Sequence, residues 1–264
     1  MKYTILLILM AMQIFAAVIK SPIVSVDNSK EIATIKIDHI DVGVSGFLVH
    51  HITPEHSTIL KNVTVIGFDK ADKIATIKMS DFDALRNSAL PYGKWKPQVG
   101  DTVELAFGYS RALLIAPSEE IYHEISKRVH IEWIHPDLFA TVLSFDGHPT
   151  PLLSDFKNFA NAGSVGLLFI YLDKKVYTVD IKSFKILNIT DAPFVAKKSQ
   201  TPFYTRVTKI DANWWGAGSS EMDAYAPHYY ELLVENNKHN KAFYEIVKSH
   251  KELHNLLDEF EIGK

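Results

Sequence analysis

Short stretches of alternating apolar and polar residues fill the first part of the chain, between residues 23 and 115. In the clearest stretch, Ala33 and Ile35 alternate with Thr34 and Lys36. A two-residue period is typical of a β-strand with one buried face. Because Gly, Asp and Pro residues separate the stretches, we expect several short strands that form a small β-barrel or a sandwich.

The pattern changes after Pro117. Ser118, followed by Glu119 and Glu120, is typical of a capped helix N-terminus. Two strongly apolar stretches within residues 165–180 flank a short polar turn and predict a β-hairpin. One more strand is expected over residues 205–210. This second part of the chain therefore mixes helices with strands.

The chain opens with Met1 and Lys2, an almost unbroken apolar run over residues 3–15, and then Ala16 and Ala17. A positive start, an apolar centre and small residues are features of a secretory signal peptide. The run is shorter than the roughly 20 residues that span a bilayer, and no later segment is long enough. We therefore predict export to the periplasm or the cell surface, with an uncleaved anchor as the alternative.

Taken together, these patterns predict an α+β protein in four segments. An N-terminal small β-barrel or sandwich is followed by an α+β segment and then by C-terminal helices. The predicted segments are a signal peptide over residues 1–17, an all-β domain over 18–116, an α+β domain over 117–210 and a C-terminal helical region over 211–264.

The composition excludes several classes of function. The chain has no cysteine, so disulfides, thiol nucleophiles and cysteine-ligated metals are ruled out. An exported chain without disulfides must depend on core packing for its stability. The net charge of -3 gives no basic field for a nucleic-acid partner.

The histidines and carboxylates form no catalytic or metal-binding pattern in the sequence. His50 and His51 are consecutive in a predicted strand and so point to opposite faces, and no well-placed carboxylate joins His51 and His56. Asp146 and His148 stand in an Asp-Gly-His-Pro run that favours a turn. Since no Gly-x-Ser-x-Gly elbow occurs either, we predict a protein that is not an enzyme and has no catalytic residue, metal or cofactor.

A strongly amphipathic helix is expected near the C-terminus, and the chain ends in Lys264. A terminal lysine carries an ammonium and a carboxylate at a fixed span. Kringle-type pockets capture such a ligand with carboxylates, a cation and aromatic walls. Lys264 is therefore a candidate ligand, together with Lys248 and Lys251 on the outer side of the helix. The apolar face of that helix comprises Phe243, Ile246, His250, Leu253, Leu257 and Phe260.

Trp214 and Trp215 stand beside a glycine-rich stretch, Gly-Ala-Gly-Ser-Ser. Exposed tryptophans are frequent anchors of protein partners. A Trp pair beside a glycine turn can also pack a helix against a barrel. The sequence alone leaves both alternatives open.

Several runs of structural residues give the chain a resemblance to a known family. They resemble the N-terminal domain of bacterial plasminogen-binding surface proteins, over about residues 20–235. The resemblance implies an exported, non-enzymatic protein whose relatives bind host plasminogen through lysines. It also implies longer relatives with a lysine- and glutamate-rich tail, which this chain lacks. The runs are ATIKI (33–37), VGVSG (42–46), HSTIL (56–60), HPDLFA (135–140), HPTP (148–151), SFKI (183–186) and PFYT (202–205).

These observations lead to two functional hypotheses. The first is an exported binding protein of the plasminogen-binding type that presents Lys264, Lys248 and Lys251 to a protein partner. The second is a structural protein of the cell envelope that docks onto a larger assembly through Trp214, Trp215 and the C-terminal helix.

Overall fold

The computed structural model describes residues 18–82, 95–195 and 198–262 of the 264-residue chain. The predicted signal peptide and Lys264 lie outside the described residues. The chain divides into two compact units, one ending at Ser110 and the other beginning at Arg111. We call the described parts of these units the barrel domain (residues 18–110) and the sheet domain (residues 111–262). The segment boundaries predicted at residues 117 and 211 stay predictions.

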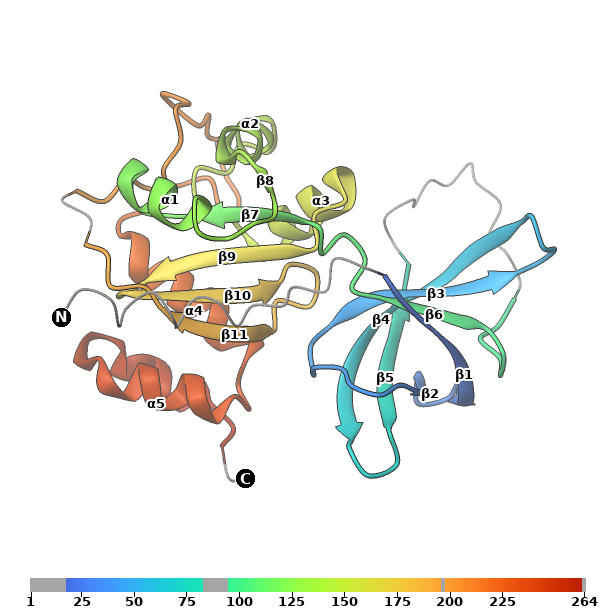
Figure 1. Ribbon diagram of the computed structural model, residues 1–264. Helices are drawn as coiled ribbons and strands as arrows, with labels where there is room; N and C mark the ends of the chain where they lie inside the picture. The colour runs from blue at the N-terminus through green and yellow to red at the C-terminus, as the bar shows by residue number, and fades with distance from the viewer. Residues whose placement is uncertain (1–17, 83–94, 196–197, 263–264) are drawn as a thin grey trace. The chain divides into compact units, whose positions relative to one another are not determined.

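The barrel domain is a closed, antiparallel six-stranded barrel, so the first of the two predicted β architectures is the correct one (Figure 1). The strand order is β1-β2-β5-β4-β3-β6, and β6 closes the barrel by pairing with β1. Strands β6, β3, β4 and β5 form a Greek key, since three consecutive strands are neighbours and the fourth returns beside the first. The strands are β1 (Ile19–Asp27), β2 (Ile32–Lys36), β3 (Ser45–His51), β4 (Ser57–Asp69), β5 (Ile74–Asp81) and β6 (Thr102–Leu105).

The two-residue period places the expected side chains inside the barrel. Ala33 and Ile35 of β2 are buried, as are Val63 and Val65 of β4. Gly46 was expected to lie in a turn between strands, but it has a different role in the structure. Gly46 lies within β3, and a Cβ atom there would stand 2.0 Å from the Glu104 carbonyl oxygen of β6. Only glycine permits so close an approach of the two backbones.

The sheet domain contains a mixed five-stranded sheet in the order β11-β10-β9-β7-β8. Strand β7 pairs in parallel with both β8 and β9, whereas β9, β10 and β11 are successive antiparallel neighbours. The predicted hairpin is confirmed, because β9 and β10 are joined by the two-residue turn Asp173-Lys174. The strands are β7 (Arg111–Ile115), β8 (Glu132–Ile134), β9 (Leu167–Leu172), β10 (Lys175–Asp180) and β11 (Ile186–Asp191).

Helices cover both faces of this sheet. Helices α2, α3, α4 and α5 and the 3-10 helix η3 contribute to one core, whose sheet side includes Leu113, Ile170 and Val179. Helix α1 lies against the opposite face, where Ile125 and Phe169 line the same small cavity. The helices are α1 (Glu119–Ser126), α2 (Pro136–Asp146), α3 (Leu153–Gly163), α4 (Tyr225–Asn236), α5 (Lys241–Ser249) and η3 (Lys251–Glu259).

Local sequence signals account for several helix ends. The hydroxyl of Ser118 accepts a hydrogen bond from the Ile121 amide at the start of α1, as the predicted cap requires. The Asn240 side chain caps α5 in the same way, since its Oδ1 accepts a hydrogen bond from the Phe243 amide at 3.0 Å. Together with the barrel and the sheet, these helices confirm the predicted α+β class.

Two expectations about strands are corrected by the structure. Residues 112–115 were expected to complete the first set of strands, but they form β7 in the middle of the second sheet. A strand was expected over residues 205–210, where the chain is irregular. The Arg206 amide donates to the Asp137 carboxylate at 2.8 Å, and the Val207 amide donates to the Thr205 hydroxyl. Side-chain acceptors therefore satisfy backbone groups that a strand would need for pairing.

The continuous C-terminal helix expected from the sequence is also corrected. The chain leaves the helix at His250, which has extended backbone angles, and resumes as η3. Both the Ser249 hydroxyl and His250 Nδ1 lie within hydrogen-bond distance of the Ile246 carbonyl oxygen. These side chains compete for the acceptor that a helical His250 amide would use, and this amide binds the Val247 oxygen instead.

Candidate binding surfaces

The predicted tryptophan pair is strongly exposed in the sheet domain. Trp214 is 96% exposed and Trp215 is 83% exposed. Within the sheet domain neither indole is buried, and packing against the barrel stays a prediction. Phe145, near the C-terminus of α2, is 85% exposed. Large apolar side chains in such positions are candidates for partner contact.

The loop that carries the tryptophans, residues 211–224, is fixed to the α2–α3 region by hydrogen bonds. The Asn213 side chain donates to the Asp146 carbonyl oxygen at 2.6 Å. The Thr150 hydroxyl donates to the Ser220 carbonyl oxygen at 2.7 Å, and the Thr150 amide donates to the Gly218 oxygen at 3.1 Å. Since Asn213 precedes Trp214 and Asp146 follows Phe145, the three exposed aromatic residues belong to one region. We call Phe145, Trp214 and Trp215 the aromatic surface.

Two of the three predicted lysine ligands lie on described, exposed positions. Lys248 is in the last turn of α5, and its Nζ lies 5.8 Å from the centre of the Tyr244 ring. Lys251 begins η3. The break at His250 therefore places these lysines on two different helices. Among the described residues neither has an ion pair within 4.0 Å, and Lys264 lies outside the described range.

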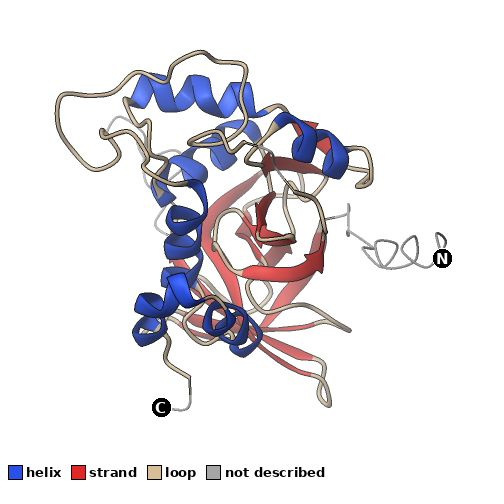
Figure 2. Cartoon of the chain, turned by 90° about the vertical axis from the view of Figure 1, so that its left-hand side faces the viewer, coloured by secondary structure: helices blue, strands red, loops and turns tan. Residues whose placement is uncertain are grey.

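The aromatic surface and the lysine-bearing helices occupy separate parts of the sheet domain. In Figure 1 the loop of residues 211–224 lies beside α2 at the top, whereas α5 lies at the bottom, and the turned view of Figure 2 agrees. The structure therefore does not bring Trp214 and Trp215 together with Lys248 and Lys251. A partner that uses both regions would have to extend along the domain.

Two histidine–carboxylate pairs escaped the sequence analysis. His148 Nδ1 lies 2.9 Å from Oδ1 of the buried Asp155, whose Oδ2 accepts a hydrogen bond from the Leu152 amide. In the barrel domain, His50 Nδ1 lies 2.8 Å from Oδ1 of the buried Asp101. The partners are 7 and 51 residues apart in sequence, so no local motif marks them.

The surroundings of the His148–Asp155 pair indicate a structural role. Asp155 ties the start of α3 to the loop before it, and Gly147 ends α2 in the left-handed conformation with φ of 71°.

Within the described ranges, no group of three or more His, Asp or Glu side chains has a metal-binding arrangement. None of the helices described here is long and apolar enough to cross a membrane.

Comparison with known proteins places the chain in a family. The family model described as the N-terminal region of plasminogen-binding protein PgbA matches residues 18–233. The chain belongs to this family. The PgbA protein of Helicobacter pylori strain J99 is 30% identical to it over 224 residues, which cover 82% of this chain and 48% of the relative.

The PgbA protein of a second Helicobacter pylori strain, 26695, has the same identity over 82% of this chain and 47% of its own length. The chain thus spans about half the length of these PgbA relatives. No solved structure matches it. The predicted resemblance is therefore confirmed, and it includes both the barrel domain and most of the sheet domain.

Proposed function

We propose that this chain is an exported, non-enzymatic binding protein of the plasminogen-binding type. The observation that carries the proposal is its membership of a family whose relatives are named plasminogen-binding proteins. Because the chain spans only about half the length of those relatives, plasminogen binding is proposed for this chain and is not carried over from them. The signal-like residues 1–17 favour a place in the periplasm or at the cell surface, where an external protein partner could be met.

In this proposal Lys264 is the principal ligand and Lys248 and Lys251 are auxiliary ones. A kringle-type pocket needs an accessible ammonium on an unobstructed stem, and Lys248 and Lys251 are exposed on α5 and η3. One exposed lysine is a weak ligand, so tight capture requires several lysines at once. Because Lys248 and Lys251 are three residues apart, their Cα atoms are separated by at most about 11 Å, so they serve as alternative ligands of one pocket.

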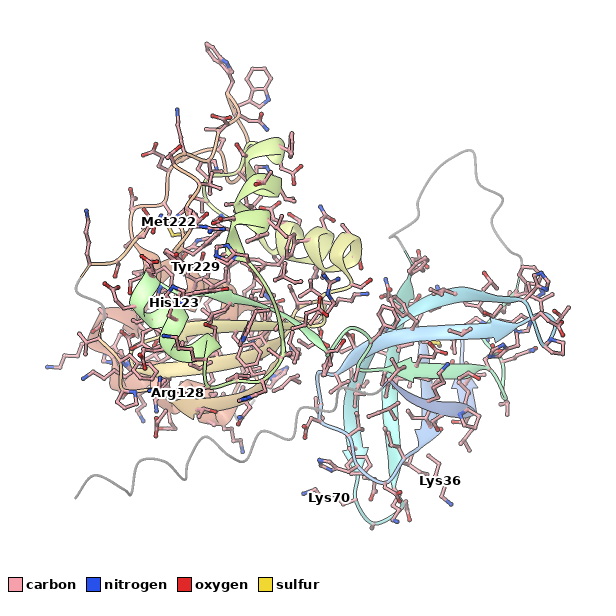
Figure 3. All side chains as sticks on the ribbon, turned by 45° about the horizontal axis from the view of Figure 1, so that its top comes forward. Lys36, Lys70, His123, Arg128, Met222 and Tyr229 are labelled. Atoms are coloured by element: carbon pink, nitrogen blue, oxygen red, sulfur yellow. The ribbon has the colours of Figure 1, made fainter. Side chains whose placement is uncertain are left out.

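Removal of Lys264 is expected to weaken plasminogen capture by about tenfold or more, because one arm of a multivalent contact is lost. Combining the deletion with Lys248→Ala and Lys251→Ala should weaken capture further. The measurement is biolayer interferometry with immobilised plasminogen and a chain of residues 18–264. Lys70→Ala is the matched control, since Lys70 is exposed in the barrel domain and should not contribute (Figure 3). If the deletion variant binds as tightly as wild type, the proposed role of Lys264 is wrong.

A second candidate function is a structural protein of the cell envelope that docks onto a larger assembly. The near-complete exposure of Trp214 and Trp215 favours it, because such residues contribute strongly to binding when a partner buries them. The C-terminal helix predicted to share this contact lies in another part of the domain (Figure 1), so the tryptophan loop is the better-supported docking element.

Replacing Trp214 and Trp215 together by alanine is expected to abolish co-purification of the chain with an envelope assembly. The circular dichroism spectrum should not change, since neither indole is part of the core. Val99→Ala, at an exposed apolar residue of the barrel domain, is the control. If the double variant still co-purifies with the assembly, this docking role is wrong. If the same variant also loses plasminogen capture, the tryptophans take part in both proposed functions.

A further inference from the structure

The sheet domain contains a cleft of about 720 Å³ beyond the ends of two parallel strands. Pro117 follows the carboxyl end of β7, and Tyr171 and Leu172 form the carboxyl end of β9. Strands β7 and β9 are parallel neighbours. The lining also includes the first residues of α4, residues 223–224 before it, His250, and Phe194, Val195, Ser199 and Thr201 of the segment after β11. All of these groups lie within the sheet domain.

The position of this cleft in the strand order is informative. From β7 the chain passes through α1 to β8 on one side, and from β8 it returns through α2 and α3 to β9 on the other side of β7. Helix α1 covers one face of the sheet and helices α2 and α3 cover the other. At the carboxyl ends, the connection after β7 leads to α1 and β8, whereas the turn after β9 leads the opposite way to β10, so the two connections diverge. In open sheets with parallel strands, ligands bind in the crevice at such a switch point.

The turn between β9 and β10 brings two charged residues to the cleft. Asp173 and Lys174 have φ angles of 45° and 65°, and both line the cleft. A two-residue hairpin turn requires positive φ at both central residues, and glycine, asparagine and aspartate adopt it most readily, so Lys174 is the less usual residue of the two.

The carboxylate of Asp173 is held in a defined position. Its Oδ2 accepts a hydrogen bond from the Tyr230 hydroxyl at 2.9 Å and lies 3.8 Å from His250 Nε2. In the described part of the chain no hydrogen bond to Asp173 Oδ1 is found, and 41% of the side chain is exposed. A second carboxylate, Asp223, lines the cleft and likewise has no hydrogen bond among the described residues.

Aromatic groups form a fixed apolar wall of the same cleft. The Tyr225 hydroxyl lies 2.9 Å from the Tyr171 carbonyl oxygen and 3.1 Å from the Ile115 carbonyl oxygen. The Tyr171 hydroxyl donates to the Phe194 carbonyl oxygen. Tyr171 is only 5% exposed and Tyr225 only 6% exposed, so a ligand would touch just the part of each ring that borders the cleft.

The charges near the strand ends disfavour a phosphate ligand. The connection after β7 has no glycine-rich sequence, and α1 carries Glu119 and Glu120 in its first turn. Phosphate sites at this position use glycine turns and an unoccupied helix N-terminus. In the lining, Lys174 and His250 are the basic groups opposite the carboxylates of Asp173 and Asp223. The described lining thus carries two carboxylates, one lysine and one imidazole.

We propose that this cleft binds a small organic cation, an amine or guanidinium group on an apolar stem. The carboxylates of Asp173 and Asp223 bind the cationic group, and the rings of Tyr171 and Tyr225 pack against the stem. The cation comes either from a free metabolite or from a lysine or arginine side chain of a peptide. The proposal is independent of plasminogen capture, in which the lysines of this chain are the ligand.

The test is a titration of an isotope-labelled chain of residues 18–264 followed by amide NMR spectra. Agmatine and the blocked peptide acetyl-Gly-Lys-Gly-amide are the two cationic probes, and 1,4-butanediol and glutarate are the neutral and anionic controls. We expect shifts at the amides of Asp173, Lys174 and Ala226 with a cationic probe only. A response to agmatine identifies a free cation as the source, and a response to the peptide alone identifies a side chain.

Substitution separates this site from general electrostatics. Asp223→Asn should weaken binding of the active probe by about tenfold, the value of a hydrogen bond to a charged group. Asp258→Asn, which removes an exposed carboxylate of η3 outside the cleft, should leave affinity unchanged. Equal weakening by both variants, shifts with glutarate, or no shift at these amides with either cation would overturn the proposal. Dispersed spectra of both variants establish that they are folded.

Discussion

Replacing Phe243 by alanine is expected to lower the free energy of unfolding of the sheet domain by about 3–5 kcal/mol. Phe243 of α5 is fully buried and stacks on Tyr230 of α4, with ring centres 6.3 Å apart. Its ring also meets Tyr177 of β10 edge-on at 5.6 Å and lies 5.9 Å from Phe260. The residue therefore joins the sheet to both C-terminal helices, and its loss leaves a cavity that three elements would have to fill.

The measurement is urea unfolding followed by circular dichroism. Phe145→Ala is the matched control, because it removes the same side chain from an exposed position and should cost less than about 0.5 kcal/mol. The family match ends at residue 233, so the variant also tests whether the later helices are part of the domain. A loss below about 1 kcal/mol would mean that α5 is not packed as described.

Replacing Asn237 by alanine is expected to cost about 3 kcal/mol, because it removes three buried hydrogen bonds. The Asn237 Oδ1 accepts from the Ile186 amide at 2.9 Å, and its Nδ2 donates to the carbonyl oxygens of Phe184 and Leu233 at 3.0 and 2.8 Å. The side chain thus connects the end of α4 with the start of β11. Each buried backbone group left without a partner costs about 1–3 kcal/mol, and these costs are not additive.

The same unfolding experiment compares this variant with Asn255→Ala. Asn255 is exposed on η3 and has no hydrogen bond from its side chain among the described residues, so its substitution should be nearly neutral. Asn237→Asp provides a second test, since it keeps the acceptor for Ile186 but loses the donors. A cost for Asn237→Ala that is no greater than that of Asn255→Ala would contradict the assigned contacts.

Features fixed by local sequence were predictable. The alternation of Ala33 and Ile35 with polar residues identified a barrel strand, and Ser118 with two following glutamates identified a helix start. The apolar stretches around Asp173 and Lys174 predicted the β9–β10 hairpin. In each case the signal lies within a few residues, where periodicity and capping act.

Features set by tertiary contacts were not predictable from pattern. Strand β7 looks like one more barrel strand, and only its pairing with β8 and β9 assigns it to the second sheet. The helix break at His250 results from side chains that compete for one carbonyl oxygen. Gly46 resembles a turn residue, although the approach of the Glu104 backbone explains it.

The candidate binding surfaces also divide into features that are visible in the local sequence and features that only the tertiary structure creates. The tryptophan pair and the lysines are visible in the sequence, and the structure adds the exposure of Trp214, Trp215, Lys248 and Lys251. The cleft at the switch point assembles groups from the segment after β7, the end of β9 and its turn, the start of α4, and His250, which are scattered over more than half of the sheet domain. No spacing rule connects these segments, because the strand order brings them together.

The most direct test of the central claim is capture of plasminogen by an immobilised chain of residues 18–264, with and without a lysine analogue. If the chain works as a lysine ligand for kringle-type pockets, 6-aminohexanoate should displace bound plasminogen almost completely. Its shorter relative glycine, which carries the same two charges at a smaller span, should not. Absence of binding, or binding that persists in saturating 6-aminohexanoate, would contradict the proposed function.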